Sequence, residues 1–368
     1  MAELRTLRIG VDGRELTGQA TGVGRYIRGV LRAWTEMPIR HRVLVFVPEL
    51  PQSELMAELG SSIEWITTGA GARPITWEQW HLPKAAAAAG VDVFFAGAYT
   101  APLRLHCPFV LVVHDVSYFA HPEWFAPRER WRRQVLTRYS VRRAARVLTV
   151  SAFSASELQR YLGVPADRIA LAPGGAPAAQ PSAPAGSEPV VLYVGSLFNR
   201  RLIPELLGGF AEATRTIPTA RLVMVGDNRT YPRIDPLQVA QSLGVTGRVA
   251  WHTWVSDVEL DRLYTSARVF AFLSTYEGFA LTPLEAIARG VPPVLLDTPV
   301  AREIYDGAAL LVPPDPPAIG KAICTLLSDG PVRDAVVARG AELLSRYTWT
   351  ATAVTILDEL ERAAGRHR

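Results

Sequence analysis

The chain has 368 residues, of which 49% are hydrophobic and 20% are charged, a composition typical of a globular protein with two domains and not of a disordered or fibrous chain. Its formal net charge of +4 is small and by itself indicates no nucleic-acid partner. Two cysteines, Cys107 and Cys324, exclude a disulfide framework and the usual zinc-binding spacings, and they favour a reducing, cytoplasmic location.

The first half of the sequence alternates short apolar segments with segments of helical periodicity. The predicted strands are residues 7–11, 43–47, 92–95, 109–113, 147–150 and 169–171. The predicted helices are residues 24–36, 54–59, 77–89, 128–145 and 154–162. A capping box of Ser154 and Glu157 is expected to open the last helix. Alternation of this kind predicts a parallel α/β sheet.

Two motifs of the first half carry candidate functional residues. The Gly-rich segment from Gly18 to Tyr26, which contains Gly22 and Gly24, follows the first predicted strand and can bring backbone amides close to a phosphate or a sugar. A simple flexible turn is the alternative. His114 follows the most apolar strand and is expected at the carboxyl edge of the sheet. There a neutral imidazole can bond a sugar hydroxyl, or it can be an ordinary satisfied histidine of the core.

The helix predicted between Arg128 and Arg146 is rich in arginine and carries Trp131, Val135 and Tyr139 on one side. Such a helix can lie on an anionic membrane surface, although a charged face in contact with water is the alternative. No apolar stretch is long enough to cross a bilayer. We therefore expect a cytoplasmic protein that makes at most a peripheral contact with the inner face of the plasma membrane through this helix.

A segment rich in Pro, Gly, Ala and Ser interrupts the alternation and predicts an interdomain linker at residues 174–189. The second alternation has predicted strands at residues 190–194, 221–225, 248–251, 269–273 and 294–296. Its predicted helices are residues 203–216, 236–243, 259–267, 282–289 and 316–328. We therefore expect Rossmann-like domains at residues 1–173 and 190–345, facing a central cleft, and a terminal segment at residues 346–368.

Two motifs of the second half carry charge that suits a nucleotide sugar. Arg200 and Arg201 follow the first strand and can neutralise a leaving diphosphate, or they can be two solvated arginines in an arginine-rich chain. Glu277 lies in a strand-to-helix loop, and Glu285 lies eight residues further on in the first turn of a helix that Thr282 is expected to cap. An ordinary capping box with a surface glutamate is the alternative.

The motif from Glu277 to Glu285 resembles the E-x7-E signature of family 4 glycosyltransferases, which are retaining, nucleotide-sugar-dependent enzymes of the GT-B fold. The segment from Val113 to Phe125 is similar to a motif of the mannosyl- and rhamnosyltransferase branches. The segment from Gly195 to Leu202 is similar to the family's Gly-x-x-x-x-Arg-Lys-Asn, with Arg201 at the lysine position and Leu202 at the asparagine position. Ala280 and Thr282 also depart from the commonest form of the signature.

The resemblance implies roles for particular residues. Glu277, His114, Arg200 and Arg201 are the expected catalytic residues, with Glu277 and His114 on the donor sugar and the arginines on the diphosphate. The residues expected to bind the rest of the donor are Glu285 on the ribose, and Gly22, Gly24, Ser196, Val255, Gly278, Phe279, Ala280, Leu281 and Thr282. The terminal helix, predicted at residues 350–363, is expected to cross back onto the N-terminal domain.

We therefore expect an α/β protein of the GT-B fold that transfers a hexose or deoxyhexose from a nucleotide diphosphate sugar to a hydroxyl of a glycan or lipid-linked acceptor. No Asp-x-Asp motif and no His/Cys cluster occurs in the sequence, so no metal and no further cofactor is expected. Two alternatives stay open on the sequence: a non-catalytic subunit that binds a nucleotide sugar, and a nucleotide-sugar 2-epimerase.

Overall fold

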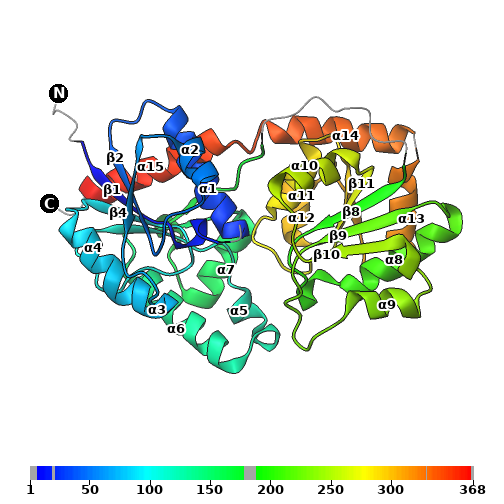
Figure 1. Ribbon diagram of the computed structural model, residues 1–368, viewed down its shortest axis with the longest axis horizontal. Helices are drawn as coiled ribbons and strands as arrows, with labels where there is room; N and C mark the ends of the chain where they lie inside the picture. The colour runs from blue at the N-terminus through cyan, green and yellow to red at the C-terminus, as the bar shows by residue number, and fades with distance from the viewer. Residues whose placement is uncertain (1–5, 19–20, 178–187, 329, 366–368) are drawn as a thin grey trace. The chain divides into compact units, whose positions relative to one another are not determined.

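The computed structural model describes residues 6–18, 21–177, 188–328 and 330–365 and divides the chain into two compact units (Figure 1). The first unit comprises residues 1–122, 127–175 and 348–368, and the second comprises residues 123–126 and 176–347. Most of the predicted linker, residues 174–189, lies outside the described residues.

The first unit is built on a seven-stranded parallel sheet with the strand order β3-β2-β1-β4-β5-β6-β7. Its strands are β1 (Arg8–Asp12), β2 (Arg42–Val47), β3 (Ile63–Thr67), β4 (Val93–Ala96), β5 (Phe109–Val112), β6 (Arg146–Thr149) and β7 (Ile169–Leu171). The central strands are buried along their whole length, as expected for a parallel sheet with helices on both faces.

The helices of the first unit connect these strands. They are α1 (Gly22–Glu36), α2 (Ser53–Leu59), α3 (Pro74–Thr76), α4 (Leu82–Ala88), α5 (Ser117–Ala120), α6 (Pro127–Arg143), α7 (Ala152–Leu162) and α15 (Trp349–Gly365). The turn η2 (Trp77–His81) between α3 and α4 is π-helical, where the sequence predicted one continuous α-helix. Helix α15 packs on α1 and on β4, β5 and β6, which confirms that the terminal helix returns to the N-terminal domain (Figure 1).

The second unit has a six-stranded parallel sheet with the order β10-β9-β8-β11-β12-β13. Its strands are β8 (Val190–Val194), β9 (Arg221–Val225), β10 (Val249–His252), β11 (Val269–Phe272), β12 (Pro293–Leu296) and β13 (Leu310–Val312). Its helices are α8 (Ile203–Thr216), α9 (Pro236–Ser242), α10 (Asp257–Ser266), α11 (Leu281–Ile287), α12 (Pro299–Tyr305), α13 (Pro316–Leu327) and α14 (Pro331–Leu344). Both sheets have the Rossmann order, in which the direction of winding reverses once.

The sequence predictions of two helix starts need correction. Helix α7 is capped by Ser151, whose Oγ accepts a hydrogen bond from the Ser154 amide, so the predicted capping box of Ser154 and Glu157 is wrong. Helix α11 begins at Leu281 after Ala280, and no side chain caps it, so Thr282 is not the cap. By contrast, Ser256 caps α10, since its Oγ accepts a hydrogen bond from the Glu259 amide at 3.2 Å.

Candidate active site

In the second unit, charged side chains gather where strands β8 and β11 end. These strands are neighbours at the point where the strand order reverses, and ligands of doubly wound sheets bind outside the carboxyl ends of the strands at such a point. Arg200 and Arg201 follow β8 in the 3-10 turn η5 (Asn199–Arg201), and Glu277 follows β11. The structure therefore brings together three residues that the sequence analysis assigned to catalysis.

Glu277 is the centre of this charged group. Its Oε1 accepts hydrogen bonds from Nε of Arg200 at 3.4 Å, from Nε of Arg201 at 3.2 Å and from Oγ of Ser274 at 2.9 Å. Burial opposes the ionisation of Glu277, but the two guanidinium groups outweigh it and lower the pKa of the carboxyl below its ordinary value. Glu277 is therefore a carboxylate at neutral pH, and two positive charges with one negative charge leave the group net positive.

The guanidinium of Arg201 is fixed on several sides. It lies over the ring of Phe272 at 4.7 Å, and its Nη1 donates to the carbonyl oxygen of Ser196 at 2.7 Å. Gly195, at φ +147°, leaves no room for a Cβ because that atom would meet the guanidinium. Burial opposes the charge of Arg201, but Glu277 raises its pKa above the ordinary value. Arg201 is therefore a permanently charged group whose position is set before any ligand binds.

Arg200 is held mainly through its backbone. The amide of Thr275 donates to the carbonyl oxygen of Arg200 at 2.8 Å, which ties η5 to the loop after β11. Its guanidinium lies over the ring of Phe198 at 4.5 Å. In the part of the chain that the structure describes, no hydrogen bond engages Nη1 or Nη2 of Arg200. These two nitrogens are the donors that form paired hydrogen bonds with a phosphate.

The loop between β11 and α11 contains a strained residue. Ala280 has φ +66° and ψ 101°, a conformation that residues with a Cβ rarely adopt. Its carbonyl oxygen accepts a hydrogen bond from the Tyr305 hydroxyl, and the ring of the preceding Phe279 packs on Tyr347 at 5.1 Å. The left-handed backbone at Ala280 turns the chain into the helix before Thr282, which is the physical reason why Thr282 is not the cap.

The predicted donor contacts Gly278, Phe279, Ala280, Leu281 and Thr282 are contiguous in this loop and in the first turn of α11. Helix α11 also carries the second glutamate of the motif, described next. Contact of these five residues with a donor stays a prediction.

Glu285 is held by a tyrosine of the neighbouring helix. The hydroxyl of Tyr264 in α10 donates to Oε2 of Glu285 at 2.8 Å. Arg289, one turn further along, lies over the Tyr264 ring at 5.0 Å and bonds Asp261. Val255, one of the predicted donor contacts, directly precedes the Ser256 cap of α10. The carboxylate that the sequence analysis assigned to the ribose therefore has a fixed direction.

In the first unit, His114 lies just beyond the end of β5, at the carboxyl edge of the sheet as predicted. Its Nε2 lies 2.9 Å from the carbonyl oxygen of Gly97. The ring of Tyr26 meets it edge-on at 4.9 Å, and the ring of Tyr99 lies 5.3 Å away. Burial lowers the pKa of His114 below its ordinary value, although the Gly97 carbonyl and the charge of Asp115 oppose this shift. His114 is therefore neutral at pH 7.

Gly22 and Gly24 lie in the first turn of α1 rather than in the loop before it. The amide of Gly24 is taken by the cap, since it donates to Oγ1 of Thr21 at 3.0 Å. A Cβ at Gly24 would collide with the carbonyl oxygen of Glu15, whereas a Cβ at Gly22 would meet nothing within 4 Å. Packing against the Glu15 carbonyl therefore explains why position 24 is a glycine. The open space at Gly22 is compatible with the predicted contact of Gly22 with a ligand.

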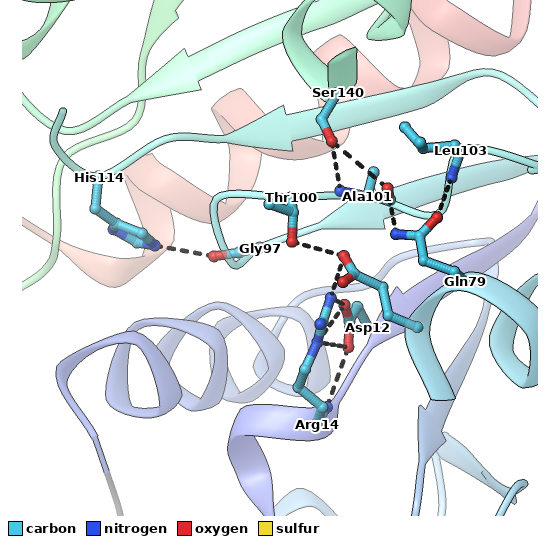
Figure 2. A network of polar contacts seen from close by, with 10 residues as sticks. Asp12, Arg14, Gln79, Gly97, Thr100, Ala101, Leu103, His114 and Ser140 are labelled. Atoms are coloured by element: carbon cyan, nitrogen blue, oxygen red, sulfur yellow. Dashed lines mark hydrogen bonds and ion pairs between the residues drawn. The ribbon is translucent and has the colours of Figure 1, made fainter. Parts of the chain in front are cut away.

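A buried polar network at the ends of β1 and β4 was not predicted from the sequence (Figure 2). Arg14 is paired with Asp12, and its Nη2 donates to Oε1 of Glu78 at 2.9 Å. Asp12 is 0% exposed and Glu78 is 3% exposed. Burial opposes the charge of Glu78, but Arg14 outweighs it and lowers the pKa of this carboxyl. The only signal in the sequence was the position of Asp12 and Arg14 directly after a strand, because nothing marks Glu78 as buried.

Helix α6 exposes one continuous face that carries positive charge. Trp131 is 67% exposed and Tyr139 is 52% exposed, and they alternate with exposed arginines at helical spacing. The exposed arginines of this face are Arg128, Arg132, Arg138, Arg142 and Arg143. We call these seven side chains the α6 basic face; it contains no acidic residue.

Comparison with solved structures identifies the class of this fold. HepE of Anabaena, solved with UDP and glucose, superimposes with a TM-score of 0.75 over 97% of this chain and 100% of its own, at 18% identity. A sucrose-phosphate synthase from Thermosynechococcus elongatus gives a TM-score of 0.77 over 99% of this chain and 100% of its own, at 20% identity. Two Rossmann-like units with a returning terminal helix are the GT-B fold of glycosyltransferases.

The sequence comparisons then give the family. The model described as Glycosyltransferase Family 4 matches residues 20–180, and the model described as Glycosyl transferases group 1 matches residues 178–343. The chain belongs to glycosyltransferase family 4. It is a retaining enzyme that transfers a sugar from a nucleotide-sugar donor, and not the binding subunit or the epimerase that the sequence alone left open.

Two curated relatives are similar to the chain. The O-antigen chain mannosyltransferase B of Escherichia coli is 28% identical over 356 residues, which cover 89% of this chain and 93% of the relative. The GDP-mannose:cellobiosyl-diphosphopolyprenol alpha-mannosyltransferase of Komagataeibacter xylinus is 32% identical over 136 residues, 36% of this chain and 35% of the relative.

Two further properties of the described residues bear on the site. Within the described ranges, no three or more His, Cys, Asp or Glu side chains are grouped so that they could hold a metal ion. Every helix of the described chain is too short or too polar to span a membrane.

Proposed function

We propose that the chain transfers mannose from GDP-mannose to a hydroxyl of a glycan carried on a lipid, in the biosynthesis of a bacterial surface polysaccharide. The observation that carries the proposal is the group of Arg200, Arg201 and Glu277 at the switch point of the second sheet, a preformed positive site for a diphosphate. The choice of mannose and of a lipid-linked acceptor rests on the names of the two relatives, one of which uses GDP-mannose and a diphosphopolyprenol.

The chemistry follows from the charges of this group. The bond between C1 of the sugar and the phosphate oxygen breaks, and the terminal nitrogens of Arg200 stabilise the negative charge that grows on the diphosphate. The acceptor oxygen forms a new bond to C1 on the same face, and its proton passes to the phosphate oxygen that has just left. We assign to Arg201 the role of a fixed positive charge beside the diphosphate, and to Glu277 and His114 the role of orienting the sugar.

The remaining donor contacts complete the proposal. Glu285 would accept hydrogen bonds from the ribose hydroxyls, as carboxylates do, and the backbone near Val255 would contact the base. The carbonyl of Ser196 already accepts from Arg201, so its part in binding is to hold that arginine. We propose further that no metal ion is needed, because the guanidinium groups supply the charge that a metal ion supplies elsewhere. Activity that persists in excess EDTA would support this step, and activity restored only by Mg²⁺ or Mn²⁺ would contradict it.

A donor assay tests the proposal as a whole. We would measure transfer from GDP-mannose, UDP-glucose and dTDP-rhamnose to a lipid-linked glycan, using the native chain and Glu277→Ala. We expect transfer only from GDP-mannose, and a loss of at least about 100-fold in kcat for the variant. Thermal shifts with GDP, UDP, dTDP and ADP check the base separately, since a ligand present at about 100 times its Kd stabilises the native state by about 2.7 kcal/mol. A shift with UDP alone would overturn the assignment of the donor.

The α6 basic face supports a peripheral contact with an anionic membrane, the surface on which a lipid-linked acceptor is found. Exposed arginines attract anionic lipids, and Trp131 and Tyr139 suit the interface between head groups and acyl chains. We expect the chain to co-sediment with vesicles that contain phosphatidylglycerol and not with neutral vesicles. Trp131→Ala should weaken this binding, whereas Trp80→Ala, which changes a 50% exposed tryptophan outside α6, should leave it unchanged.

A further inference from the structure

The loop after β4, residues 97–103, is held at two separate ends (Figure 2). At its far end, the amide of Leu103 donates to Oε1 of Gln79 at 3.0 Å and the amide of Ala101 donates to Oγ of Ser140 at 3.0 Å. At its near end, the carbonyl of Gly97 meets Nε2 of His114 and the hydroxyl of Thr100 meets Oε1 of Glu78 at 2.6 Å. The near end therefore links a buried carboxylate to the histidine assigned to the donor sugar.

A strained residue lies between the two contacts of the near end. Tyr99 has φ +63°, which is uncommon for a residue with a large side chain. Its ring lies 5.3 Å from the His114 ring and its hydroxyl donates to Oδ2 of Asp115 at 3.1 Å. A strained backbone persists only where its surroundings hold it in place. The bonds of Gly97 and Thr100, on either side of Tyr99, contribute to that hold. The Tyr99 amide adds to it by donating to the carbonyl oxygen of Val112 at 2.9 Å.

The direction of each hydrogen bond in this chain of contacts is determined by chemistry. Glu78 is ionised beside Arg14, so its oxygens only accept and the Thr100 hydroxyl must donate. The carbonyl of Gly97 also only accepts, so Nε2 of His114 must carry the proton. In the neutral ring Nδ1 then bears a lone pair. No hydrogen bond within the described residues engages Nδ1 of His114.

We propose that Glu78 is a positioning residue for the transfer reaction. Through Thr100 and the strained loop, Glu78 fixes the position of the Gly97 carbonyl. This carbonyl holds His114 as the Nε2–H tautomer, and Nδ1 is then free to accept a hydrogen bond from a hydroxyl. The turn that carries Glu78 is π-helical, and single π-turns inside helices are frequent at functional sites. The consequence for the substrate, that a sugar hydroxyl donates to His114, rests on the proposed function; the linkage from Glu78 to the tautomer does not.

The test compares two substitutions of one side chain. Thr100→Val keeps the volume and the branching but loses the hydroxyl donor, and Thr100→Ser keeps the donor. We would record the imidazole nitrogen shifts of the full chain by long-range ¹H–¹⁵N NMR, with the His114 signals assigned by their loss in His114→Gln. We expect a single Nε2–H tautomer in the native chain and in Thr100→Ser. In Thr100→Val and Glu78→Gln we expect a mixture of the two tautomers.

Ser140→Ala supplies the matched control, because it removes the two bonds between Ser140 and Ala101 at the far end of the same loop and leaves the Glu78–Thr100 bond in place. It should keep the native His114 signals. Unchanged signals in Thr100→Val would overturn the proposal. An equal change in Ser140→Ala would also overturn it, because general loosening of the loop would then be the cause. If Glu78→Gln does not fold, Thr100→Val still decides the question.

Kinetic measurements distinguish a failure of this inference from a failure of the proposed function. With the donor assay, we expect Thr100→Val to lower kcat about tenfold with little change in the donor KM. A misplaced His114 would orient the bound sugar poorly for the reaction but would weaken its binding little. Thr100→Ser should restore the native kcat. A changed tautomer with a native kcat would leave the linkage from Glu78 to the His114 tautomer in place. It would remove the assigned contact of His114 with the sugar and, with it, the role of Glu78 in the transfer reaction.

Discussion

Two residues with positive φ, Leu202 and Ala280, occupy two of the positions where the chain departs from the motifs that it resembles. Leu202 has φ +44° and ψ +48°, and the corresponding position of the motif is asparagine. Ala280 has φ +66°, and the corresponding position is glycine. Asparagine and glycine adopt such conformations at low cost, whereas leucine and alanine do not. The chain therefore has a strained backbone at both places, in conformations that the residue types of the motif adopt at lower cost.

Replacement of Ala280 by glycine should relieve this strain. A residue with a Cβ pays about 1–2 kcal/mol at positive φ, and glycine loses about 0.5–1 kcal/mol through the greater freedom of the unfolded chain. We expect Ala280→Gly to stabilise the second unit by about 0.5–1 kcal/mol, which denaturant titration would measure. The control is Ala211→Gly inside α8, which should destabilise by about 1 kcal/mol. An equal loss of stability in Ala280→Gly and Ala211→Gly would show that Ala280 is not strained.

The ion pairs of Glu277 predict a particular dependence of stability on pH. Because the folded state lowers the pKa of Glu277 below the unfolded value of 4.5, its stabilising effect is complete above pH 4.5 and is lost as the pH falls toward the folded pKa. Glu277→Gln should cost about 3 kcal/mol at pH 7, since two buried arginines lose their partner. The difference in the free energy of unfolding between the native chain and the variant, measured by urea unfolding, should become smaller below pH 4.5. A constant difference would contradict the assignment.

Gly22 and Gly24 allow packing to be distinguished from binding. Gly22→Ala adds a Cβ in open space, so we expect an unchanged Tm and a donor KM that rises about tenfold if the added methyl meets the donor. Gly24→Ala forces a Cβ against the Glu15 carbonyl and should lower the stability by about 2 kcal/mol. Native kinetics in Gly22→Ala would remove Gly22 from the donor site.

At the scale of elements, the sequence predicted the strands well and the helix starts less well. Every predicted strand is present within one residue of its expected bounds, because buried parallel strands are short uninterrupted apolar runs. The missed strands, β3 and β13, lie at or near the edge of their sheets, where Glu64 and the exposed Thr67 break the apolar run of β3. Helix starts depend on φ and ψ of single residues such as Ala280, which no periodicity reveals.

The same limit applies to the candidate site. Arg200, Arg201 and Glu277 could be named because each directly follows a strand, and the ends of β8 and β11 meet at the switch point. Glu78 could not be named, because it lies inside a predicted helix and its burial depends on contacts with Arg14 and Thr100, which are distant in sequence. Sequence patterns locate a site along the chain; they do not show which buried charges support it.

The contact between α1 and α15 offers a test at a single glycine. A Cβ at Gly29 in α1 would lie 2.5 Å from ring atoms of Trp349, and the ring of Tyr26, also in α1, lies 5.8 Å from the Trp349 ring. Because the added Cβ would overlap the Trp349 ring, we expect Gly29→Ala to destabilise the first unit by about 1–3 kcal/mol through overpacking, despite the better helix propensity of alanine. The double variant Gly29→Ala with Trp349→Leu should recover part of this loss. Thermal unfolding that is unchanged in Gly29→Ala would mean that the helices do not pack as described.

On the scale of the whole molecule, the first unit is completed by the end of the chain. Ala353, Ile356 and Leu360 of α15 are 0% exposed within it, and the Trp34 indole donates to the Ala353 carbonyl at 3.0 Å. Loss of each large buried side chain costs about 2–5 kcal/mol, while a domain has only about 5–15 kcal/mol of stability in total. A chain that ends at Tyr347 should therefore fail to fold its first unit.

Limited proteolysis with mass spectrometry would follow this truncation. We expect rapid cleavage within residues 21–175 and continued protection of residues 188–328, because the second unit keeps all of its own strands and helices. A chain that ends at Gly365 is the control and should resist cleavage in both units. Adding a peptide of residues 348–365 to the truncated chain should restore protection of the first unit. Native protection without α15 would show that the terminal helix is an accessory to this fold and not part of its core.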